Sequence, residues 1–149
     1  HFHYVLVTGA VLALIAAVYY WWPKWTGRMY NEFWGKFHFW WTMVFVNLLF
    51  FPQHFLGLAG MPRRIPDYNP VFADWNLISS IGAFGMFATP FMMAAILLAS
   101  LRNGKRAEAR AWESAKGLEW TIPSPAPAHT FTVPPVIKPG DLAHDDVTH

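Results

Sequence analysis

Cysteine is absent from the 149 residues, so no disulfide, thiolate metal site or thioether attachment of a haem can form. Charge is scarce as well: 13% of the residues are charged, against about a quarter in a typical soluble domain, whereas 54% are hydrophobic and 18% aromatic. The net charge of +2 and the scattered basic residues argue against a nucleic-acid partner. The few carboxylates form no dyad, and we identify no catalytic residue. If the chain binds a metal or a haem, histidine must hold it.

Three apolar segments are each long enough to cross about 30 Å of hydrocarbon, which needs roughly 20 helical residues. They cover about residues 2–22, 33–58 and 74–101. The first ends in aromatic residues of the interfacial type, with Pro23 as the expected helix stop, and the second is expected to leave through Gly57 and Gly60. Pro90 is expected to kink the third. The sequence therefore predicts an all-α membrane protein, with residues 1–116 as its transmembrane part.

The basic residues predict the orientation of these helices, and the prolines predict the conformation of the tail. The basic residues of the first connection and of the region after the third helix are Lys24, Arg28, Lys36, Arg102, Lys105, Arg106, Arg110 and Lys116. The positive-inside rule places both regions on the inner side and the connection 60–73 outside. Residues 117–149 are proline-rich and predict an extended tail on the inner side. The start at His1 predicts a processed, split or excerpted piece of a larger protein.

His1-Phe2-His3 opens the first membrane segment. Successive helical residues are rotated by about 100°, so side chains at i and i+2 leave roughly 200° apart. The two imidazoles therefore cannot easily hold one ion, but they can hold two cofactors, one on each flank, with Phe2 between them. Two other interpretations stay open: simple interfacial polar residues, or, if His1 is a true amino terminus, a copper chelate of its amino group and ring with another histidine.

Other polar residues of the membrane segments have less specific interpretations. His38 and His54 are expected to be hydrogen-bonded packing residues rather than ligands. Arg63 and Arg64 break the positive-inside rule, since they lie together in the outer connection. They are either anchors for lipid headgroups or a bidentate clamp on carboxylates, and in both cases the pair requires an anionic partner.

Several blocks of residues follow one another along the chain in a definite order and spacing. They are His1-Phe2-His3-Tyr4-Val5-Leu6, Phe51-Pro52-Gln53-His54-Phe55-Leu56-Gly57, Gly60-Met61-Pro62-Arg63-Arg64 with Asp67-Tyr68, Trp75-Asn76 with Ile78-Ser79-Ser80, Leu118-Glu119-Trp120, and His129-Thr130-Phe131. Together these blocks resemble subunit I of the haem-copper cytochrome c oxidases. The resemblance covers essentially the whole chain and weakens after Val133. It implies the last three of that subunit's twelve helices, in the aa3-type branch of bacterial plasma membranes or mitochondrial inner membranes.

The resemblance implies a role for each residue of the candidate sites. His1 is similar to the proximal ligand of the high-spin haem a3, and His3 to one axial ligand of the low-spin haem a. Phe2 then lies between the macrocycles, and Arg63 and Arg64 match the pair that binds haem propionates. Two haems, expected to be of the A type, are implied, together with the copper CuB, whose ligands lie outside this chain. The sequence itself does not distinguish haem A from haem B or O.

The implied function is that of part of the catalytic subunit of a proton-pumping terminal oxidase, which reduces O2 to water with electrons from cytochrome c. The implied partners are the remainder of subunit I, subunit II with CuA, subunit III, cytochrome c and the lipid bilayer. A quinol oxidase is one alternative, although Tyr4 and Pro52-Gln53-His54 favour the cytochrome c branch. A non-catalytic membrane scaffold is the other.

Overall fold

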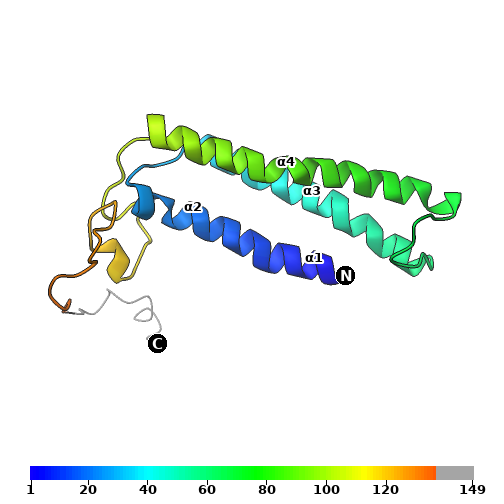
Figure 1. Cartoon of the computed structure of the whole chain (residues 1–149), viewed down its shortest axis with the longest axis horizontal. Coiled ribbons are helices and arrows are strands. Elements are labelled where there is room, and N and C mark those ends of the chain that lie inside the picture. Colours follow the sequence, from blue (N-terminus) through cyan, green and yellow to red (C-terminus); the bar gives the residue numbers. More distant parts are fainter. Residues whose placement is uncertain (137–149) are drawn as a thin grey trace. The chain divides into compact units, whose positions relative to one another are not determined.

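The structure is a computed structural model that describes residues 1–136. It contains three helical stretches long and apolar enough to span a bilayer, Phe2–Thr26, Glu32–Leu58 and Pro70–Asn103 (Figure 1). Within the described residues, extended pairing is limited to one isolated bridge between Arg28 and Arg106. The prediction of an all-α membrane protein with three spanning helices is confirmed.

The first stretch consists of α1 (Phe2–Leu6), a π-helical turn (Val7–Val11) and α2 (Leu12–Thr26). The expected stop at Pro23 was wrong, because α2 continues through this proline to Thr26. A proline removes a single backbone donor, a loss that a membrane helix tolerates. The helix ends at Thr26, and the next residue, Gly27, has a φ of 68° and donates its N–H to the Pro23 carbonyl at 2.8 Å. A positive φ is readily adopted only by glycine, so Gly27 is the physical stop signal.

Helices α3 (Glu32–Leu58) and α4 (Ala73–Asn103) approach closely at two glycines of α4. A Cβ on Gly82 would overlap the backbone of Leu48 and Leu49, and one on Gly85 would overlap the ring of Phe45. Small residues are typical of membrane helix interfaces, because they let the two backbones come together. The connection between the helices contains a short 3-10 helix, Pro70–Phe72.

The chain forms two compact units. The first combines His1–Ala16 with Glu32–Leu97, and the second combines Ala17–Asn31 with Leu98–His149, of which the structure describes the part up to residue 136. Within the second unit the tail contains one 3-10 turn, Leu118–Trp120, and otherwise no helix or strand as far as it is described. The rest of the predicted tail, residues 137–149, lies outside the described residues.

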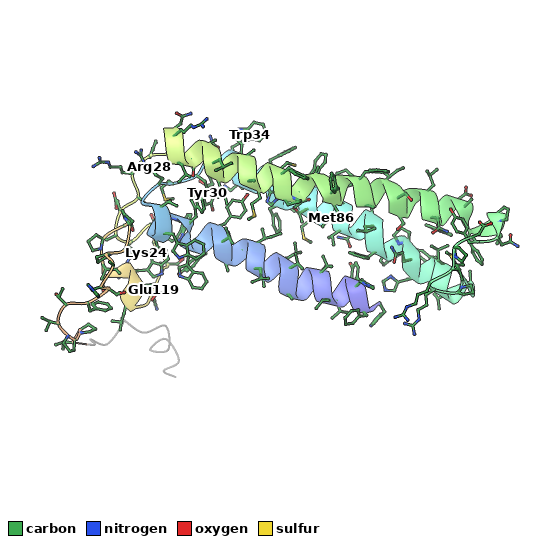
Figure 2. All side chains as sticks on the ribbon, viewed as in Figure 1. Lys24, Arg28, Tyr30, Trp34, Met86 and Glu119 are labelled. Carbon is green, nitrogen blue, oxygen red and sulfur yellow. The ribbon has the colours of Figure 1, made fainter. Side chains whose placement is uncertain are left out.

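Lys24 belongs to α2 and is only 3% exposed, so it is not the loop residue that the sequence suggested. Its ammonium group donates to the carbonyls of Ala109 and Ile122, both at 2.8 Å, and lies 5.1 Å from the ring centre of Trp120. The backbone N–H of Ala126 donates to the Lys24 carbonyl. Figure 2 shows Lys24 on the side of α2 that faces the segment carrying Glu119. A buried cation with two carbonyl partners therefore ties the segment after α4 to the end of α2.

Candidate functional site: the histidines and arginines at one end of the helices

His1 and His3 begin the first membrane helix, and both side chains are exposed. The ring of His1 meets the ring of His54 edge-on, with 5.8 Å between the centroids and 79° between the planes. The ring of His3 lies parallel to that of Phe50, at 6.1 Å and 10°. His54 and Phe50 lie one turn apart on the same face of α3, so each candidate ligand packs beside a different ring of that face.

Tyr4 lies between the directions of the two histidines on α1 and fixes this contact. Its hydroxyl donates to Asn47 Oδ1 at 2.6 Å, and Asn47 Nδ2 donates to the Met43 carbonyl at 2.7 Å. The Tyr4 ring also meets the ring of His54 edge-on at 5.5 Å. Both polar ends of the Asn47 amide thus have a partner, which fixes its orientation. The sequence analysis missed Asn47; its signal is that it is the one polar residue in the stretch 43–52 and lies two turns before His54 on the same face of the helix.

His54 and His38 both have the hydrogen bonds expected of packing histidines. His54 Nδ1 lies 3.2 Å from the carbonyl oxygens of Phe50 and Phe51, which can only accept, so Nδ1 carries a proton and donates. His38 is buried, and its Nε2 lies 3.2 Å from the Thr89 carbonyl. His38 precedes His54 by about 24 Å along α3 at 1.5 Å per residue, so only His54 belongs to the site of His1.

The connection that carries the arginines begins at a well-formed helix end. Gly60 has a φ of 85°, its N–H donates to the Gly57 carbonyl, and the N–H of Met61 donates to the Leu56 carbonyl at 3.0 Å. This is the Schellman arrangement, so Gly60 is the exit from α3 that the sequence predicted. Asn76 Nδ2 at the start of α4 lies 3.5 Å from Met61 Sδ, which joins the two ends of the connection.

Arg63 and Arg64 are exposed, and neither forms an ion pair with a carboxylate of residues 1–136. Arg64 has a φ of 61°, and it is the one non-glycine residue of the described chain with a positive φ. That left-handed conformation is unfavourable for a residue with a Cβ by about 1–2 kcal/mol. Backbone strain of this kind concentrates at ligand-binding segments. Two adjacent guanidinium groups without an ion-pair partner among residues 1–136 suit an anionic ligand, and their fork geometry matches carboxylates and phosphates; the ligand itself stays a prediction.

The donor set also limits what the histidines can hold. No group of three or more histidine or acidic side chains able to share a metal ion gathers in the described part of the chain. An ion held by three or more such side chains therefore has no site among the described residues, whereas a chelate that uses the amino group of His1 stays untested. A single imidazole also fits a group that brings its own equatorial donors, such as a haem, which takes axial ligands from the protein.

Comparison with known proteins supports this interpretation. The family model described as Cytochrome C and Quinol oxidase polypeptide I matches residues 1–85, which include both histidines and both arginines. The chain belongs to this family. Cytochrome c oxidase subunit 1 of Cereibacter sphaeroides is 50% identical over 133 residues, and that of Bacillus sp. (strain PS3) is 45% identical over 141 residues.

This chain matches only part of the length of its relatives. The two matches include 88% and 93% of this chain, but only 24% and 23% of the relatives. The chain thus spans about a quarter of the length of these curated proteins. Both are named cytochrome c oxidases, whereas the family as a whole also includes quinol oxidases.

Proposed function

We propose that this chain is part of the catalytic subunit of a haem-copper terminal oxidase, and that it provides one axial ligand to each of two haems. His1 is the proximal ligand of the high-spin haem, and His3 is one axial ligand of the low-spin haem. Bound haem supplies the redox-active iron for electron transfer and oxygen reduction. The remainder of subunit I, with the ligands of CuB, subunit II with CuA, and subunit III complete the enzyme.

One arrangement supports the proposal: the two exposed imidazoles lie beside different rings of α3, and side chains at i and i+2 of a helix leave it roughly 200° apart. Two ligands of one haem would have to point at the same iron. Side chains that leave opposite sides of a helix can instead reach two separate haems. Phe2 lies between the two ligands in the sequence, and its ring meets the His3 ring at 5.4 Å. In the assembled protein Phe2 therefore separates the two haems.

Arg63 and Arg64 bind the haem propionates in this proposal. Their exposure, the absence of a carboxylate partner within residues 1–136 and the left-handed backbone at Arg64 support an anionic ligand. Guanidinium groups beside a haem stabilise its reduced state, because they offset the electron that the iron gains. Arg63→Gln is therefore expected to lower the midpoint potential of the nearer haem, measured by spectroelectrochemical titration. An unchanged potential would contradict the clamp.

The direct test of the ligand roles is the reduced-minus-oxidised optical spectrum of the membrane complex, with and without carbon monoxide. We expect His1→Ala to remove the signal of the haem that binds carbon monoxide and His3→Ala to disturb the low-spin band. His38→Ala is the matched control, since it removes a histidine from the other end of α3. If neither His1→Ala nor His3→Ala changes a haem band, the ligand roles fail.

Cytochrome c is the proposed electron donor, because both curated relatives are named cytochrome c oxidase subunit 1. Steady-state oxygen uptake with reduced cytochrome c, compared with uptake on ubiquinol, distinguishes the two branches of the family. Turnover on ubiquinol alone would make the protein a quinol oxidase. The remaining alternative, a scaffold that binds no haem, requires that the purified assembly lack a Soret band.

A further inference from the structure

Helix α3 presents one ring to each candidate ligand, and the two rings lie one turn apart. His54 meets His1 edge-on at 5.8 Å, and Phe50 stacks on His3 at 6.1 Å. Edge-to-face and stacked arrangements at such distances restrict the rotation of the rings involved. The orientation of each candidate ligand is therefore coupled to a different side chain of the same helix.

His54 is itself held from three directions. Its Nδ1–H donates to the carbonyls of its own helix at 3.2 Å, its ring is met by the Tyr4 ring at 5.5 Å, and Phe51 packs against it at 5.8 Å. Tyr4 in turn is fixed by its 2.6 Å hydrogen bond to Asn47. A ring fixed in this way can transmit a defined orientation to His1. Packing alone does not require the His54 ring to be held in this way, because α1 and α3 already contact each other through Tyr4.

We propose that His54 and Phe50 are positioning residues: His54 sets the ring plane of His1, and Phe50 sets the ring plane of His3, so α3 adjusts the two haems separately. The inference rests on the proposed ligand roles. Outer contacts that orient a metal-binding histidine change its basicity and the properties of the metal. Separate contacts let the potential and ligand affinity of one haem be set without altering the other.

The test uses the assembled oxidase that contains this chain and two matched variants that each replace a ring with an aliphatic side chain, His54→Leu and Phe50→Leu. Resonance Raman spectra of the ferrous enzyme report the iron–histidine stretch of the high-spin haem, and electron paramagnetic resonance reports the low-spin haem. We expect His54→Leu to shift and broaden the iron–histidine band and leave the low-spin signal unchanged. Phe50→Leu should shift the low-spin signal and leave the iron–histidine band unchanged.

Two milder variants keep the test decisive if a leucine variant fails to assemble. His54→Phe retains the ring but loses the hydrogen bonds to the carbonyls, and Tyr4→Phe retains its ring but loses the bond to Asn47. Both are expected to broaden the iron–histidine band, and His54→Phe less than His54→Leu. An iron–histidine band that is unchanged in every variant, or equal changes at both haems in either leucine variant, would overturn the inference.

A failure of the ligand roles has a different signature. His1→Gly with added imidazole restores the iron–histidine band if His1 is the proximal ligand, because free imidazole can occupy the vacated position. If His1→Gly leaves the band intact without imidazole, the proposed function is wrong. A different outcome is that His1→Gly abolishes the iron–histidine band, whereas the His54 variants, which retain His1, leave it unchanged. In that case only the positioning role is wrong.

Discussion

Replacing Gly82 by alanine adds a single methyl group at the closest approach of α3 and α4. The added Cβ would lie inside the van der Waals envelope of the backbone of Leu48 and Leu49. Carbon atoms pack best about 3.5–4.0 Å apart, and main-chain atoms cannot rotate away as a side chain can. The helices must therefore separate locally.

The size of the effect follows from what this separation disturbs. Overpacking of a tight interface costs about 1–3 kcal/mol. Two interhelical hydrogen bonds flank Gly82, from Ser79 Oγ to the Leu49 carbonyl at 2.7 Å and from Trp41 Nε1 to the Gly85 carbonyl at 2.9 Å. Each is worth about 0.6 kcal/mol in a membrane protein. We therefore expect Gly82→Ala to destabilise the contact by roughly 2–4 kcal/mol.

Gly57→Ala is the matched control, because it makes the same chemical change on α3 where, apart from adjacent residues and the helix's own backbone, no atom lies within 4 Å of the new Cβ. Alanine favours a helix over glycine by up to about 1 kcal/mol, so this variant should be as stable as the wild type or slightly more stable. The assay is titration of the detergent-solubilised complex with sodium dodecyl sulfate, followed by tryptophan fluorescence. Equal midpoints for Gly82→Ala and Gly57→Ala would refute the close-contact argument.

Three further substitutions probe other contacts. Lys24→Met removes the donor to the buried Ile122 carbonyl and to the less buried Ala109 carbonyl, and it should loosen the segment after α4 by about 1–3 kcal/mol. The change is seen as faster limited proteolysis there, whereas the exposed Lys36→Met should not increase cleavage; equal cleavage rates would contradict this. Arg64→Gly removes a guanidinium group but relieves the left-handed backbone, so we expect a lower haem potential without a lower melting temperature; a lower melting temperature would show that the arginine is needed structurally. Trp41→Phe loses the hydrogen bond to Gly85 and should lower the detergent-titration midpoint by about 0.6 kcal/mol, and an unchanged midpoint would show that this bond contributes nothing.

Local sequence pattern correctly predicted the membrane class, the number of spanning helices and the exit from α3. These features are local: about 20 apolar residues suffice for a span, and Gly60 supplies its own positive φ. The motif blocks also follow one another in order along the chain, which is why the family resemblance is visible in the sequence alone. The assignment of Pro23 as a helix stop failed because a proline weakens a helix locally but does not end it.

The contacts between distant side chains are apparent only in the folded chain. His54 follows His1 by more than fifty residues, so its edge-on contact with that ring has no local sequence signal. The sequence predicts Lys24 as a loop residue, yet it is buried and donates to the carbonyls of Ala109 and Ile122, which lie far along the chain. The left-handed backbone at Arg64 likewise cannot be predicted from the sequence, because an arginine does not favour this conformation. Contacts between distant residues depend on how helices pack, and hydrophobic pattern fixes the helices but not their packing partners.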